Sequence, residues 1–110
     1  MSNKQKYGEV ITPFHFVETI LDLLPKEVFK NPHLKWLDPC AGSGNFAHIL
    51  YKRLFVGLSA EIKEPNKRHQ HIIENMIYMI ELNGDHIGGL FELFGENANI
   101  AHIDYLHLHR

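Results

Sequence analysis

The sequence has only one cysteine, so no disulfide can form within a single chain, and a reducing, cytoplasmic location is expected. It also lacks a long apolar run. The most apolar early stretch, residues 11–24, carries Glu18 and Asp22 and is not predicted to span a membrane. Neither sign of charge dominates, since the formal net charge is −2 with histidine neutral. The composition therefore gives no sign of a nucleic-acid-binding surface.

The length and composition predict one globular domain. A chain of 110 residues is long enough for one domain and too short for two. Hydrophobic residues make up 45% of the chain and charged residues 22%, the usual balance for a folded soluble protein. Internal repeats and low-complexity segments are absent, so disordered and collagen-like chains are excluded.

The hydrophobic spacing predicts alternating helices and short strands. The first helix begins at Thr12-Pro13, where the hydroxyl can cap and the proline is tolerated, and Pro25 ends it. Its apolar face carries Phe14, Val17, Ile20, Leu21 and Leu24. The further elements predicted are a short helix at 26–30, strands at 34–37, 76–80 and 99–103, and helices at 45–58, 66–75 and 87–94. This order predicts an α/β layer architecture.

An acidic residue follows or ends each predicted strand, namely Asp38, Glu81 and Asp104. In a parallel sheet the three carboxylates lie along one edge, at the carboxyl ends of the strands. Open α/β sheets bind their ligands at that edge. Acidic residues in such places often only cap a following turn or helix, and that interpretation stays open for Glu81 and Asp104.

A glycine-containing turn lies between the first strand and the next helix. Gly42 and Gly44 let the backbone turn tightly and approach a bound molecule, although glycines alone are equally typical of an ordinary turn. A Walker loop is excluded because Asn45 and Phe46 follow the second glycine. A dinucleotide fingerprint fits poorly, because the ribose-binding acid is expected about 20 residues further on. Glu81 follows Gly44 by 37 residues.

Four sequence blocks together resemble the class I S-adenosylmethionine-dependent methyltransferases, in the form typical of adenine-amino (N6) DNA methylases of restriction-modification systems. The segment Asp38-Pro39-Cys40-Ala41-Gly42-Ser43-Gly44-Asn45-Phe46 resembles motif I of that family. The other three blocks are 7–13, which resembles the motif upstream of motif I, 81–83, which resembles motif II, and 104–106, which resembles motif III. They stand in the family's order and extend over nearly the whole chain.

The resemblance implies a role for each matching residue in binding S-adenosylmethionine. Ala41, Gly42 and Gly44 would lie against the amino-acid end of the cofactor, Asp38 would accept hydrogen bonds from its ammonium group, and Thr12 would contact its carboxylate. The two oxygens of Glu81 suit adjacent ribose hydroxyls. Asp104 would accept from the adenine amino group, with Leu82 and Tyr105 on either side of that ring. Thr12 as a simple helix cap and Tyr105 as a core residue are the alternatives.

The resemblance also implies a Rossmann-like methyltransferase fold that is incomplete. The chain would be a partial cofactor-binding domain, residues 1–110, with the first three parallel strands and flanking helices. The family's catalytic Asn/Asp-Pro-Pro-Tyr/Phe block does not occur in the sequence, so no catalytic residue is assigned. We therefore expect a fragment or truncated product that contacts DNA only through regions missing from it. Its open first strand favours self-association or pairing with a missing half.

Other functions stay open at this point. The acceptor of the methyl group could be RNA or protein, and the chain could be a non-catalytic remnant that binds only the cofactor or a partner. A nicotinamide-dependent oxidoreductase is disfavoured by the spacing described above. Cys40 is most simply a small loop residue. The nine histidines show no zinc-ligand spacing, so no metal site is predicted.

Overall fold

A computed structural model of the chain describes residues 14–103. Thr12, Asp104 and Tyr105 lie outside these residues, and so does the predicted start of the first helix. The described elements are, in order, α2 (Phe14–Asp22), η1 (Lys26–Lys30), β1 (Trp36–Asp38), α3 (Asn45–Gly57), α4 (Pro65–Asn75), β2 (Ile77–Glu81), η2 (Gly84–His86), α5 (Ile87–Phe94) and β3 (Asn99–His102). None of the described helices is long and apolar enough to cross a membrane.

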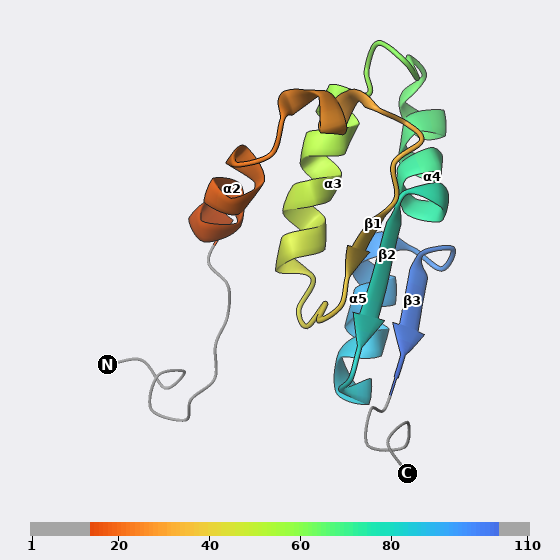
Figure 1. The fold of residues 1–110 in the computed structure, drawn as a ribbon. Helices are drawn as coiled ribbons and strands as arrows, with labels where there is room; N and C mark the ends of the chain where they lie inside the picture. Colours follow the sequence, from red (N-terminus) through yellow and green to blue (C-terminus); the bar gives the residue numbers. More distant parts are fainter. Residues whose placement is uncertain (1–13, 104–110) are drawn as a thin grey trace.

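The three strands form a parallel sheet in the order β1-β2-β3. The register pairs Leu37 with Tyr78 and Tyr78 with Asn99. All three arrows run the same way, so the loops that follow β1 and β2 meet at one end of the sheet (Figure 1). The predicted alternation of helices and strands is confirmed within the described residues. The result, three parallel strands with flanking helices, is compatible with a partial Rossmann-like α/β fold.

The hydrophobic core lies between one face of the sheet and the helices α3, α4 and α5. Along β2 the burial alternates, with Ile77, Met79 and Glu81 buried and the residues between them only partly covered. This is the period of two that a strand imposes on its side chains. Leu50 and Leu54 of α3 belong to the same buried cluster. Burial of each such side chain contributes roughly 1.5–3 kcal/mol, which fixes the sheet against the helices.

The predicted apolar face of the first helix is only partly buried, which corrects the sequence-based expectation. Val17 and Leu21 are fully covered, whereas Phe14, Ile20 and Leu24 are exposed by 38% or more. The reason is that α2 packs against α3 on one side and lies beyond it, away from β3 (Figure 1). No described element covers the remaining apolar side of α2.

The sheet face opposite the helices is open within residues 14–103. Leu37 is 59% exposed there, in the middle of the edge strand β1. A shallow depression of about 390 Å³ lies on this face, lined by Leu37, Tyr78, Met79, Ile80, Asn99, Ile100 and Ala101. Parallel sheets are normally covered on both faces, whereas within residues 14–103 this sheet is covered by helices on one face only.

Candidate functional site at the carboxyl edge of the sheet

Two acidic side chains lie at the carboxyl edge of the sheet. Asp38 is the last residue of β1 and Glu81 the last of β2, and these strands are neighbours. Both residues are buried, with exposures of 7% and 6%. The structure thus brings together two of the three acids that the sequence placed at this edge. The third, Asp104, lies outside the described residues.

Each of these carboxylates has one oxygen bonded within the protein and one without a partner. Asp38 Oδ1 accepts a hydrogen bond from the N–H group of Cys40 at 3.1 Å, and Glu81 Oε1 accepts one from the N–H group of Leu82 at 3.0 Å. The buried atoms Asp38 Oδ2 and Glu81 Oε2 have no hydrogen-bond partner. A buried acceptor without a donor costs about 1–3 kcal/mol, more when charged. This pair is therefore matched to a ligand that donates hydrogen bonds or carries positive charge.

The environment of Asp38 disfavours its charged form. Burial raises the pKa of the Asp38 carboxyl above its ordinary value of 3.8, and the charge of Glu81 raises the pKa further. The hydrogen bond from the Cys40 N–H group acts in the opposite direction and is the smaller influence compared with burial. A perturbed carboxyl at the ligand edge of an α/β sheet is typical of a functional site.

The turn between β1 and α3 presents bare backbone beside these acids. Gly42 has a φ angle of +55°, and a Cβ atom added to it would meet nothing within 4 Å, so the space next to it is open. Ala41 is buried, its N–H group donates to the Ile80 carbonyl at 3.0 Å, and its carbonyl accepts from Gly44. Ala41 therefore ties the turn to β2, while the space next to Gly42 stays free.

Gly44 has a different structural requirement. It precedes α3 with a φ angle of +88°, in the left-handed region that favours glycine. A Cβ atom at Gly44 would approach side-chain carbons of Leu93, Leu90 and Phe94 to 3.0–3.1 Å. The absence of a side chain here lets the first turn of α3 pack against α5. The packing alone explains this glycine, whereas it does not explain Gly42.

The loop after Glu81 forms the other side of the site. Leu82 is 42% exposed, and Asn83 accepts a hydrogen bond from the Asp85 N–H group at 2.9 Å, which starts η2. The sequence reasoning missed His102, the last residue of β3, whose Nε2 atom lies 3.1 Å from the carbonyl oxygen of Leu82. Its pairing with Glu81 depends on the sheet register, which is not readable from the sequence.

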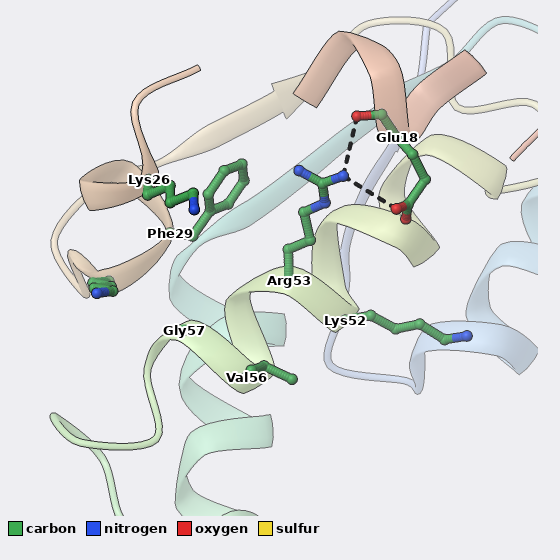
Figure 2. A pocket seen from close by; sticks show the side chains of 8 residues that line it. Glu18, Lys26, Phe29, Lys52, Arg53, Val56 and Gly57 are labelled. Atoms are coloured by element: carbon green, nitrogen blue, oxygen red, sulfur yellow. Dashed lines mark hydrogen bonds and ion pairs between the residues drawn. The ribbon is translucent and has the colours of Figure 1, made fainter. Parts of the chain in front are cut away.

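A cavity of about 420 Å³ lies elsewhere, between η1, α2 and the last turns of α3. Figure 2 shows Arg53 reaching from α3 toward Glu18, beside the ring of Phe29. Its Nη2 group contacts Glu18 Oε2 at 3.1 Å and Asp22 Oδ1 at 2.9 Å. These contacts hold α2 against α3. We therefore interpret the residues around this cavity as structural and refer to this region, where α2, η1 and α3 meet, as the structural corner. The cavity is lined by residues at the C-terminal end of α3, opposite the glycine turn that precedes this helix.

The two unpartnered acceptors at the carboxyl edge fit a cationic or hydroxyl-bearing ligand, since Asp38 and Glu81 offer one such oxygen each. Within residues 14–103 no three His, Cys, Asp or Glu side chains gather closely enough to hold a metal. Zinc sites in proteins, by comparison, use three or four protein ligands. An ammonium group and a pair of hydroxyls would satisfy the two acceptors.

The two buried acids thus lie at the edge where open, parallel α/β sheets generally bind their ligands. No protein-family model matches the chain. Over 77 residues the chain is 40% identical to a protein of Mycoplasma pneumoniae named "Uncharacterized adenine-specific methylase". The match covers 67% of this chain and 18% of that protein, so the chain spans less than a fifth of this relative's length.

Proposed function

We propose that the chain is the cofactor-binding part of an S-adenosylmethionine-dependent DNA methyltransferase that modifies the adenine amino group. The observation that carries this proposal is the pair of buried acceptors, Asp38 Oδ2 and Glu81 Oε2, at adjacent strand ends beside a bare glycine turn. The similarity to a protein named as an adenine-specific methylase supports the same function over part of the chain.

Each side of the proposed site suits one end of the cofactor. Asp38 would accept from the ammonium group of the methionine moiety, and the open backbone of Gly42 would take its carboxylate. Glu81 would accept from the ribose hydroxyls through its free oxygen, and the exposed side chain of Leu82 would flank the adenine ring. Three further residues of the proposed site lie outside the described residues. We assign Thr12 to the carboxylate of the cofactor, and Asp104 and Tyr105 to its adenine. Ammonium to carboxylate is a charge-assisted contact, the strong type of hydrogen bond.

When bound, S-adenosylmethionine supplies an electrophilic methyl group on a positively charged sulfur. The residues of this chain bind and orient the molecule, and we assign none of them to the transfer itself. The sequence contains no two consecutive prolines and therefore no Asn/Asp-Pro-Pro-Tyr/Phe block. The acceptor base and the DNA would be held by polypeptide other than this chain.

The proposal also includes a partner polypeptide, which would cover the two surfaces that the described elements leave open. Those surfaces are the sheet face around Leu37 and Tyr78 and the exposed side of α2, which includes Ile20. The sheet face is apolar, and the exposed side of α2 carries apolar side chains among polar ones. An edge strand such as β1 also offers unpaired backbone groups to a further strand. A missing half of the domain or a second copy of the chain are the two partners that this predicts.

Isothermal titration calorimetry with the 110-residue chain tests the cofactor proposal. We expect saturable binding of S-adenosylmethionine at one site and no binding of NAD. We also expect S-adenosylhomocysteine to bind, because it keeps the amino-acid end and the ribose that the two carboxylates contact. Preferential binding of NAD, or failure of both methionine-derived ligands to bind the folded chain, would reject the proposal.

A further inference from the structure

We propose that His102 is a positioning residue for the cofactor site, which fixes the loop that carries Glu81 and Leu82. This inference rests on the proposed function. His102 is exposed and its ring lies beside the loop, where Nε2 is 3.1 Å from the Leu82 carbonyl oxygen. A carbonyl oxygen only accepts hydrogen bonds, so Nε2 must carry the proton and donate.

The end of β3 holds two consecutive peptide groups of this loop. The N–H group of Ile103 donates to the Glu81 carbonyl at 3.1 Å, which fixes the peptide between Glu81 and Leu82. The side chain of His102 donates to the Leu82 carbonyl and fixes the next peptide. With both planes held, the two backbone dihedral angles of Leu82 have little freedom.

The restraint on the backbone at Leu82 also affects the carboxylate of Glu81. The N–H group of Leu82 donates to Glu81 Oε1 at 3.0 Å, so the orientation of this peptide sets the orientation of the carboxylate. One oxygen is thereby held, while Oε2 has no partner in the protein and is the atom left for a ligand. The same restraint directs the exposed side chain of Leu82, which the proposed function places beside the adenine.

Gly84 gives an independent reason to assign a role to this histidine. A Cβ atom at Gly84 would lie 3.2 Å from Cε1 and 3.7 Å from Nε2 of the His102 ring. The positive φ angles of the described glycines are at Gly42, Gly44 and Gly95, so Gly84 does not need glycine for its backbone conformation. The space that glycine leaves at this position is taken by the imidazole.

The test compares glutamine and asparagine at position 102, because each reproduces a different nitrogen of the imidazole. His102→Gln places an amide N–H group about where Nε2 stands, whereas the shorter side chain of His102→Asn ends near the position of Nδ1. We expect His102→Gln to keep the affinity for S-adenosylmethionine within about twofold of the original chain. We expect His102→Asn to weaken it about threefold to tenfold, the loss of one neutral hydrogen bond.

A second readout does not depend on the cofactor. In the free chain, amide hydrogen exchange at Leu82 should become faster in His102→Asn than in His102→Gln. Gly84→Ala should act in the same direction as His102→Asn, since the added methyl group displaces the ring. His86→Asn is the matched control, because His86 lies exposed in the same loop and should leave both readouts unchanged.

The outcomes separate this inference from the proposed function. Failure of the folded, unsubstituted chain to bind S-adenosylmethionine would reject the proposed function, and the exchange rates would still decide whether His102 orders the loop. Equal exchange and equal affinity in His102→Gln and His102→Asn would overturn the inference. The inference would also be overturned if the affinities of the variants followed their melting temperatures and did not depend on whether the side chain places a nitrogen at the position of Nε2.

Discussion

Asp38 and Glu81 are buried at the ends of adjacent parallel strands, close enough for the charge of Glu81 to raise the pKa of Asp38. Two like charges in such a place oppose folding, and each leaves one oxygen without a partner. Residues that bind a ligand commonly cost stability when the ligand is absent. This relationship between the two acids leads to the first predictions.

Replacement of Asp38 by asparagine should stabilise the free chain and weaken cofactor binding. The variant removes a buried charge while its side-chain oxygen can still accept from the Cys40 N–H group. We expect a gain of roughly 0.5–2 kcal/mol in the free energy of unfolding near neutral pH. The affinity for S-adenosylmethionine should fall about tenfold or more through loss of a charged hydrogen bond. Urea unfolding and calorimetry measure the two effects, with the exposed Asp85→Asn as a control that changes neither.

The stability of the chain should depend on pH through Asp38. Because the pKa of Asp38 is raised in the folded state, that state binds the proton more tightly than the unfolded chain does. The contribution of Asp38 to stability is therefore most favourable below 3.8 and declines as the pH rises through the raised pKa. Unfolding free energies measured between about pH 4 and about pH 7 should show this decline relative to Asp38→Asn. A constant difference between the two proteins would contradict it.

Replacement of Glu81 by alanine should weaken binding of S-adenosylmethionine by about 1–3 kcal/mol, because a charged hydrogen-bond acceptor is lost. Calorimetric titration of the folded variant measures the change. Glu92→Ala, an exposed acid on α5, is the matched control and should bind as the original chain does. An affinity that stays the same in Glu81→Ala would remove Glu81 from the site.

The two glycines of the turn should respond differently to alanine. Gly44→Ala combines a left-handed backbone with contacts of 3.0–3.1 Å to side chains of α5, so we expect a loss of about 2–4 kcal/mol in unfolding free energy. Gly42→Ala meets open space and should lose only about 1–2 kcal/mol, with a reduced cofactor affinity. Gly88→Ala, in the first turn of α5 with free space around it, should stabilise by up to about 1 kcal/mol. Equal losses at positions 42 and 44 would show that the contact with α5 is unimportant.

The open sheet face should cause association at high protein concentration. Sedimentation velocity over a range of concentrations should show oligomers of the original chain and fewer of Leu37→Lys, which places a charge on that face. Val56→Lys is a matched control, since Val56 is 73% exposed but lies on α3 near the structural corner. A monodisperse monomer that melts cooperatively would argue against an interface on this face.

The sequence alone predicted the order of the described helices and strands, apart from η2, and the acids at the first two strand ends. Hydrophobic periodicity fixed α3 almost to the residue, since 45–58 was predicted and Asn45–Gly57 is observed. The strand around Trp36 begins later than predicted and includes Asp38, because its bounds depend on pairing with Ile77 and Met79 rather than on local pattern. The predicted helix at 66–75 buries Arg68, which donates to the backbone carbonyls of Ile62, Phe55 and Lys63, and these contacts are not readable from local spacing.

What the sequence determined by itself was the pattern: which segments are helices and strands, and where acids and glycines stand between them. These follow from local spacing and backbone preferences. Only the tertiary structure decided that Glu81 pairs with His102, that Gly44 is required by α5, and that three of the five residues on the predicted apolar face of the first helix stay exposed. Each of these depends on contacts between residues distant in the sequence, and such contacts follow from sheet register and helix packing, which no local pattern encodes.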